Sequence, residues 1–167
     1  MNVGDWQGSG TYVGQSGGTA VILSCRHVAV QVGKTVKVTW PATGEVSMGT
    51  VIEVVKATDD FQSDLALITC PVPAGIPSVE IAEFNPANAP FICLGYKGEQ
   101  FFVSISRTGR ANGNLIDLSA PLTGGMSGGP CLDRYNRLVG VGVGSTPTYS
   151  VAADGEYLAA LIRKYSH

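Results

Sequence analysis

Short β-branched segments separated by glycine and proline turns constrain the fold of this chain more than any other feature. Seven such segments follow one another: GTAVILS, KTVKVTW, GTVIEVVKA, DLALITC, APFICLGY, FFVSIS and RLVGVGVG. Val, Ile and Thr suit a pleated, half-buried surface, and short strands at turn-punctuated spacing are typical of sandwiches and barrels. The sequence therefore predicts an all-β fold.

Helical periodicity occurs only near the end of the chain, in DGEYLAALIRKY at 154–165. Four apolar residues of this segment share one face, an acidic residue lies near its start and two basic residues lie in its last turn. We expect one C-terminal α-helix after the strands.

A proline-rich stretch divides the chain. Residues 70–90, CPVPAGIPSVEIAEFNPANAP, carry five of the nine prolines and little sustained strand pattern. We expect an N-terminal lobe at 1–75, a connector at 76–90 and a C-terminal lobe at 91–167, each lobe with about six short strands given typical strand lengths.

Composition and charge exclude several function classes. With 44% hydrophobic and 14% charged residues the chain is typical of compact globular proteins, and a net charge of −2 without a basic run predicts neither a nucleic-acid nor a membrane partner. The longest apolar run, at 19–25, is too short to span a bilayer, and the first residues, MNVGDWQGSG, lack the features of a secretion signal. We expect a cytoplasmic protein, or one encoded by a virus or phage and acting in the host cytoplasm.

The four cysteines, at 25, 70, 93 and 131, form no CxxC pair and no Cys/His cluster. A metal site is therefore not expected. Buried free thiols in a reducing compartment are the simplest interpretation, and one disulfide remains an alternative.

Ser127 lies in the glycine-rich segment GGMSGGP. Glycines on both sides let the backbone adopt positive φ and approach a substrate closely, so that the N–H groups of Gly125 and Ser127 can point together at a developing oxyanion. The segment is built as acyl transfer requires around a nucleophile, although a plain glycine-rich turn could share its composition.

A serine nucleophile needs a base, usually a histidine oriented by a carboxylate. The chain has two histidines, and His167 is its last residue, so His27 at the end of GTAVILSCRHV is the candidate base. Asp64 in QSDLALI is the candidate carboxylate, with Asp59 and Asp60 as nearby competitors. Both residues also have a purely structural interpretation: His27 could simply end a strand, and Asp64 could simply start one.

The segments SCRHV, SDLALI and GGMSGGPCLD with RLVGVGVG, in this order, resemble the chymotrypsin-like (trypsin-fold) serine peptidases. Compact bacterial and viral-type members and the protease domain of the HtrA family are the most similar, over about residues 8 to 162. The resemblance implies two six-stranded antiparallel β-barrels with the active site between them.

Carried over by position, the resemblance makes Ser127 the nucleophile, His27 the general base and then acid, and Asp64 the group that orients His27. Gly125 and Ser127 would supply the oxyanion N–H groups. The implied chemistry is peptide hydrolysis through an acyl-enzyme, without metal or cofactor.

The sequence departs from the secreted digestive members at two places. Met126 stands where they have an Asp that pairs with a new N-terminal ammonium, so we expect activity without N-terminal trimming. Val28 follows His27 where they have Cys, and Cys25 precedes it, so their disulfide set is not expected here.

The resemblance also indicates a pocket for the residue before the scissile bond. Its lining would come from Pro121, Leu122, Thr123, Gly142, Val143, Gly144 and Ser145. Pro121 cannot bind a cation, and the chain has no spare histidine for recognising Gln or Glu. The expected preference is for small to medium apolar residues, and the strand edge at 142–145 could bind an extended peptide by β-augmentation.

Other readings remain. GMSGG also fits the nucleophile elbow of α/β-hydrolases, but that motif needs a following helix and a later Asp and His. A subtilisin-like order of Asp5, His27 and Ser127 would need an α/β fold. A third reading is a protease-fold module that binds without catalysis, and the chain could be a free enzyme or part of a polyprotein.

Overall fold

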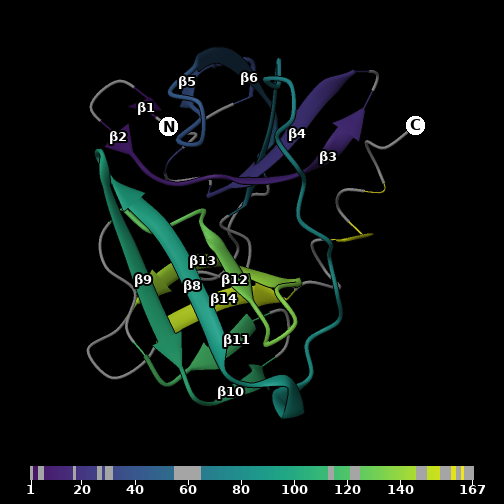
Figure 1. Ribbon diagram of the computed structural model, residues 1–167, viewed down its shortest axis with the longest axis vertical. Helices are drawn as coiled ribbons and strands as arrows, with labels where there is room; N and C mark the ends of the chain where they lie inside the picture. The colour runs from purple at the N-terminus through teal and green to yellow at the C-terminus, as the bar shows by residue number, and fades with distance from the viewer. Residues whose placement is uncertain are drawn as a thin grey trace.

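The structure is a computed structural model, and its strands form two antiparallel sheets of seven strands each (Figure 1). It describes all residues except 1, 4–5, 17, 26–27, 29–31, 55–64, 113–114, 121–124, 146–149, 155–158, 161–162 and 164–167, and the backbone alone at 2–3, 6–7, 16, 144–145 and 150–154.

The first sheet is built from residues 2–70 in the order β2-β1-β5-β6-β7-β4-β3. Its strands are β1 (Asn2–Val3), β2 (Trp6–Gln7), β3 (Thr11–Ser16), β4 (Thr19–Ser24), β5 (Thr35–Thr39), β6 (Val46–Val54) and β7 (Ala66–Cys70). Bulges shift the register between Tyr12 and Gly14 and between Val51 and Glu53.

The second sheet is built from residues 91–154 in the order β10-β11-β14-β13-β12-β8-β9. Its strands are β8 (Phe91–Lys97), β9 (Gln100–Ser106), β10 (Gly109–Asn112), β11 (Leu115–Leu118), β12 (Pro130–Leu132), β13 (Leu138–Ser145) and β14 (Ser150–Asp154). In Figure 1 the two sheets lie one above the other.

This architecture confirms the expected all-β fold. Among the described residues each sheet has seven strands rather than about six. In the first sheet, β1 and β2 have only two residues each and are too short to produce a sequence pattern. The proposed lobe boundaries at 75/76 and 90/91 stay predictions.

Three hydrophobic clusters form the core. One lies within the first sheet and includes Ile22 and Trp40, and another lies within the second sheet around Phe91. A third cluster joins the sheets, with Leu23 from β4 and Val141 from β13 among its members. The two faces of β4 contribute to different clusters, so the strand is buried from residue 20 to residue 24. Its sequence is therefore a continuous apolar run and does not alternate between apolar and polar residues.

The segment between the sheets bonds to both of them. Val79 donates its N–H to the carbonyl of Tyr12 in β3 at 3.1 Å, and Ala82 donates to the carbonyl of Leu138 in β13 at 2.8 Å. A short 3-10 helix, η1 (Pro86–Asn88), precedes β8. The connector therefore packs as part of the fold.

Most of the expected C-terminal helix lies outside the described residues. Ala159, Ala160 and Arg163 have helical backbone, and the helix stays a prediction. No helix formed by the described residues is long and apolar enough to cross a membrane.

Candidate active site

Ser127 lies in a tight loop that runs into β12. Its side chain is half-buried, and the glycines near it take the conformations that the sequence predicted, with φ of 96° at Gly125 and 91° at Gly128. A positive φ of this size is strained for any residue with a Cβ. The loop thus depends on glycine at these two positions.

Every carbonyl from residue 125 to residue 128 accepts a hydrogen bond from the protein. The donors are the Ser9 hydroxyl to Gly125 (2.8 Å), the Gly129 N–H to Met126 (2.9 Å), the Ser9 N–H to Ser127 (2.9 Å) and the Thr11 hydroxyl to Gly128 (3.0 Å). The loop is therefore held on its carbonyl side along its whole length.

The N–H groups of the same loop divide into two kinds. Gly128 donates to the carbonyl of Gly142 at 2.7 Å and Gly129 donates to that of Met126. The N–H groups of Gly125 and Ser127, in contrast, form no hydrogen bond with any described residue. Gly125 and Ser127 are only partly buried, so these two N–H groups can bond to water or to a ligand.

Residues 8–11, which lead from β2 into β3, support the loop, and no motif in the sequence indicates this contact. Besides the bonds already described, the Ser24 hydroxyl donates to the carbonyl of Ser9 at 2.8 Å. Ser9, Thr11 and Ser24 are all buried. Their partners lie far away along the chain, so no local motif could identify them.

Two loop glycines also lack room for a side chain. A Cβ at Gly128 would lie 2.0 Å from the carbonyl oxygen of Ser9, and a Cβ at Gly129 would lie 2.0 Å from that of Leu94. Both obstacles are backbone atoms that cannot move aside easily. The close approach of three chain segments explains why the sequence around Ser127 is rich in glycine.

His27 and Asp64 lie outside the described residues, so their geometry toward Ser127 stays a prediction, as does the choice between Asp64 and the competitors Asp59 and Asp60. The residues beside His27 and Asp64 are described. Cys25, Val28 and Leu65 are buried together in the cluster between the sheets.

Gly8 lies against both the His27 segment and the Ser127 loop. A Cβ at Gly8 would be 2.5 Å from Val28 Cγ2 and 3.1 Å from the carbonyl oxygen of Ser127. The Cys25 thiol donates to the carbonyl of Gly142, which also holds Gly128. The chain on either side of His27 is thus packed against the Ser127 loop.

Met126 anchors the loop in the second sheet. Its side chain is buried in the cluster that contains Phe91 and Cys131. A buried thioether carries no charge, and the expected activity without N-terminal trimming stays a prediction.

The predicted substrate segments are only partly described. Pro121, Leu122 and Thr123 lie outside the described residues, and only the backbone of Gly144 and Ser145 is described. The Val143 side chain is fully buried in the cluster between the sheets, and both backbone groups of Gly142 bond to the Ser127 loop. Val143 can therefore contact a substrate only through its backbone.

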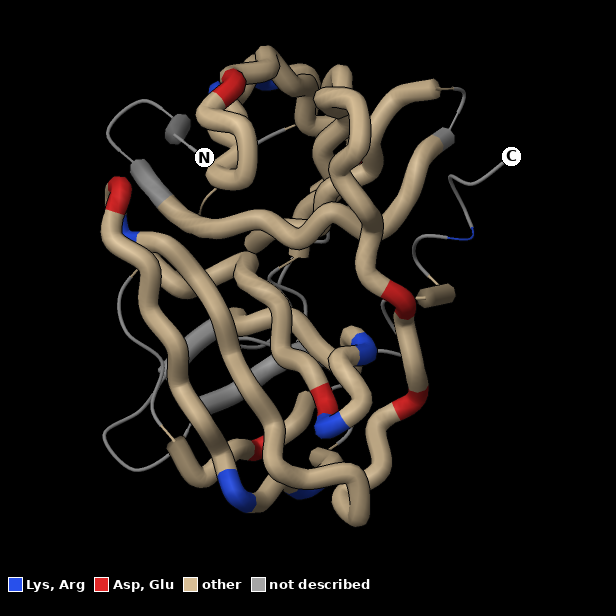
Figure 2. Tube along the Cα trace, viewed as in Figure 1, with Lys and Arg blue, Asp and Glu red and all other residues tan. Residues whose placement is uncertain are grey.

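A cleft of about 900 Å³ opens beside the loop, between the first sheet and the β8–β9 hairpin. It is lined by Gly8, Ser9, Gly10, Lys37, Thr39, Pro41, Gly44, Leu94, Gly95, Tyr96, Gly98, Glu99, Phe101 and Pro130. Because Ser9 and Tyr96 also contact the loop, the cleft and the loop share a wall. Figure 2 shows the Lys and Arg positions of the described chain scattered along the trace, together with those of Asp and Glu.

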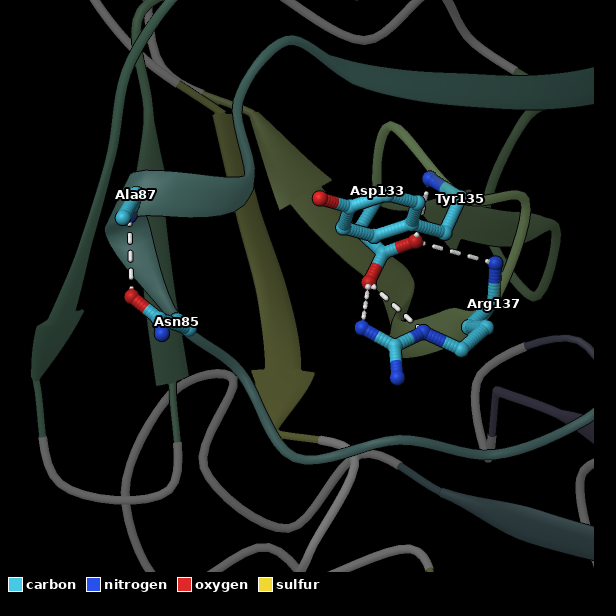
Figure 3. Close-up of polar contacts among 5 residues, drawn as sticks. All are labelled: Asn85, Ala87, Asp133, Tyr135 and Arg137. Atoms are coloured by element: carbon cyan, nitrogen blue, oxygen red, sulfur yellow. Dashed lines mark hydrogen bonds and ion pairs between the residues drawn. The ribbon is translucent and has the colours of Figure 1, made fainter.

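The β12–β13 hairpin that follows the loop is closed by an ion pair between the buried Asp133 and the partly exposed Arg137. The Asp133 carboxylate accepts hydrogen bonds from the N–H groups of Tyr135 and Arg137, and from the Arg137 guanidinium at 3.0 and 3.2 Å (Figure 3). On the other side of the same view, Asn85 caps η1 by accepting from the N–H of Ala87.

All four cysteines are buried free thiols, as the sequence indicated. Cys93 and Cys131 face each other across β8 and β12 with their sulfurs 3.3 Å apart. Their hydrogen bond, together with burial, raises the pKa of Cys131 well above its ordinary value. Burial alone raises the pKa of Cys70 to about 11. Thiolates are therefore disfavoured at both positions near neutral pH.

Comparison with known proteins agrees with this architecture. The trypsin-like peptidase domain model matches residues 8–141. A solved structure of the serine protease of a human pathogenic astrovirus is similar over 92% of this chain and 85% of its own, with a TM-score of 0.67 and 22% sequence identity. The search of curated proteins found no match.

The chain therefore belongs to the trypsin-like peptidase domain family, and its fold is chymotrypsin-like. By class it is a serine endopeptidase, with polypeptides as substrates. The resemblance expected from the sequence is confirmed at this level, whereas the likeness to HtrA proteases rests on the sequence motifs alone.

Proposed function

We propose that this endopeptidase cleaves peptide bonds through an acyl-enzyme on Ser127, with His27 as base and then acid and Asp64 orienting His27. One observation carries the proposal. The N–H groups of Gly125 and Ser127 are unpaired among the described residues, although every carbonyl from 125 to 128 is bonded. Preorganised donors of this kind stabilise the oxyanion of a tetrahedral intermediate.

The packing around Gly8 supports the proposed partnership of His27 and Ser127. Val28, which follows His27 in the sequence, and the Ser127 carbonyl both lie against this glycine. A base must reach its nucleophile at hydrogen-bond distance, and adjacent backbone segments make such contact feasible.

Labelling with a fluorophosphonate probe tests the nucleophile. We expect the wild-type protein to be labelled and the Ser127→Ala variant not to be. Ser104→Ala serves as the control for another serine of the second sheet and should be labelled as the wild type is. Equal labelling of the Ser127→Ala variant would refute the assignment.

Kinetics of further variants test the base and the carboxylate. Triad members act as a unit, so His27→Ala should lose on the order of 10⁴-fold in kcat, and Asp64→Asn should be severe. Asp59→Asn and Asp60→Asn should be mild. If either of these were more damaging than Asp64→Asn, the orienting carboxylate would have to be reassigned.

We also propose cleavage after small to medium apolar residues such as Ala, Val, Leu or Met. Support comes from the uncharged segments at 121–123 and 142–145 and from the position of Pro121, which cannot bind a cation. Since Val143 is buried and Gly142 is bonded to the loop, peptide pairing on this strand falls to the backbone beyond Gly142. Profiling a peptide library at the position before the cut decides the matter, and a dominant preference for Arg, Lys, Glu or Gln would overturn it.

A further inference from the structure

The Ser127 loop needs support that its own sequence does not supply. Met126 lies in the core of the second sheet and carries no charge with which to fix the loop by an ion pair. Residues 121–124 lie outside the described residues. The described contacts to Gly125 are made by residues that are distant from it in the sequence. The strongest of these contacts come from Ser9.

Ser9 bonds to the loop at two points. Its hydroxyl oxygen lies 2.8 Å from the carbonyl of Gly125, and its N–H donates to the carbonyl of Ser127 at 2.9 Å. These two carbonyls belong to the two residues whose N–H groups form the proposed oxyanion hole. Ser9 is 5% exposed, so water does not replace these bonds readily.

The direction of the Ser9 hydroxyl proton follows from its neighbours. The N–H of Tyr96 donates to the hydroxyl oxygen at 2.8 Å. The hydroxyl has one proton to donate, and the Gly125 carbonyl at 2.8 Å is much closer than that of Tyr96 at 3.5 Å. The Ser9 hydroxyl thus accepts from β8 and donates to the loop, a chain in which each bond polarises the next.

These bonds fix successive peptide planes. The Ser9 hydroxyl holds the plane after Gly125, the Gly129 N–H holds the plane after Met126, and the Ser9 N–H holds the plane after Ser127. Peptide units are planar, so a fixed carbonyl also fixes the N–H of the residue that follows it. The three bonds therefore set the N–H groups of Met126, Ser127 and Gly128 in turn, and Ser9 holds the planes on either side of the one that carries the Ser127 N–H. Glycine rotates easily about its own bonds, so the bond from the Ser9 hydroxyl to the Gly125 carbonyl limits how far the loop can turn just before Met126 and Ser127.

We propose that Ser9 is a positioning residue of this peptidase, whose hydroxyl holds the carbonyl of Gly125 and so keeps the loop before Ser127 in place, so that the Ser127 N–H of the oxyanion hole is oriented before substrate arrives. The inference rests on the proposed role of Ser127. Ser9 acts through Gly125 rather than on the substrate, so its loss should weaken transition-state stabilisation and leave ground-state binding nearly unchanged.

The test compares Ser9→Ala with a matched loss of a buried hydroxyl, Ser106→Ala. Ser106 is 1% exposed, donates to the carbonyl of Thr108 at 2.6 Å and accepts from the N–H of Ser119 at 2.8 Å, so it has the same pattern of bonds far from Ser127 in sequence. Removing a whole oxyanion donor costs about 10²–10³ in kcat, and a misoriented one should cost less. We expect Ser9→Ala to lower kcat about 10- to 100-fold with KM within about threefold, and Ser106→Ala to change kcat by less than about threefold.

A rescue variant separates the hydroxyl from the fold. Ser9→Thr retains the hydroxyl and should recover kcat to within about fivefold of wild type. Should Ser9→Ala fail to fold, as judged by its thermal unfolding, Ser9→Cys takes its place, because a thiol is of similar size and a weak donor.

Several results would overturn the inference: kcat of Ser9→Ala near wild type, a loss confined to KM, an equal loss in Ser106→Ala, or no recovery in a folded Ser9→Thr. If Ser127→Ala is inactive while Ser9→Ala is fully active, only the positioning role fails. Activity retained in Ser127→Ala removes the proposed function and this inference together.

Discussion

Gly128 occupies a position that no other residue can fill without moving the backbone. Its φ is 91°, and a Cβ there would meet the carbonyl oxygen of Ser9 at 2.0 Å. Left-handed backbone costs about 1–2 kcal/mol for a residue with a Cβ, and overpacking adds about 1–3 kcal/mol. We expect Gly128→Ala to lower the free energy of unfolding by about 2–5 kcal/mol and to abolish most activity.

Gly18→Ala is the matched control for this prediction. Gly18 has a φ of 80° but open space where the Cβ would lie, so only the backbone strain of about 1–2 kcal/mol applies. Urea unfolding of both variants measures the difference. Equal costs would mean that the contact with Ser9 does not restrict the loop.

Cys70 makes the stability of the folded protein depend on pH in the alkaline range. Burial raises its pKa to about 11 from an ordinary value of 9.0, so the folded protein keeps a proton that the unfolded chain loses first. Stability from this group is complete below about pH 9 and is lost as pH rises toward 11, because the unfolded state then binds fewer protons.

Urea unfolding at pH 8 and pH 10.5 should therefore show a fall in stability, and Cys70→Ala should show a smaller fall. Cys70→Ala also loses a buried side chain, so the comparison is made on the pH difference within each protein. The same fall in both proteins would assign the effect to other groups.

At the scale of single residues, features made by neighbours in the sequence could be predicted, whereas contacts between distant residues could not. The glycines around Ser127 are adjacent in sequence, and their positive φ could be predicted from that alone. Ser9 and Gly125 are 116 positions apart, and Ser9 stands in an ordinary GSG turn sequence. Only the folded backbone brings the two together.

At the scale of elements, the β12–β13 hairpin depends on Asp133. This carboxylate is fully buried, holds two backbone N–H groups and pairs with Arg137. Removing one partner of a buried pair costs about 3–5 kcal/mol, and Arg137 is partly exposed, so Asp133→Ala should cost about 2–4 kcal/mol.

Asp117→Ala provides the comparison, since Asp117 pairs with an Arg110 whose side chain is 81% exposed. Exposed pairs are worth about 0–1 kcal/mol. Thermal unfolding of the two variants should differ clearly. A cost for Asp133→Ala no larger than that for Asp117→Ala would show that the hairpin does not need its ion pair.

The same distinction applies to the strands: some have a recognisable sequence pattern, and others are defined only by the strands with which they pair. All seven β-branched segments contribute residues to strands, and most of them are buried on at least one face, whereas β9 is held mainly by its pairing with β8. Strands such as β10, with the sequence GRAN, and β12, with PCL, carry no alternating pattern and are defined by the neighbours with which they pair. Their positions follow from the sheet and could not be predicted from their residues.

At the scale of the molecule, one hydrophobic cluster contains residues of both sheets. Leu23 and Leu67 of the first sheet share it with Leu138 and Val141 of the second. Separate unfolding of the sheets would expose this cluster, so we expect one cooperative transition. Both tryptophans lie in the first half of the chain, so their fluorescence reports the first sheet while far-UV circular dichroism reports both.

The two signals should give the same midpoint in urea. Leu138→Ala, which removes a fully buried side chain from the second sheet, should lower both midpoints equally, with a cost of about 2–5 kcal/mol. A fluorescence midpoint unaffected by Leu138→Ala would mean that the sheets unfold independently.

The dependence of the Ser127 loop on Ser9 from one side and Gly142 from the other also sets when the protein becomes active during its synthesis. A growing chain that ends before the loop presents Ser9 and Thr11 without the carbonyls that they bind, and a chain that ends before Gly142 lacks the acceptor for Gly128. Under the proposed assignment, the nascent polypeptide cannot hydrolyse its neighbours or itself until the ribosome has produced most of the second sheet.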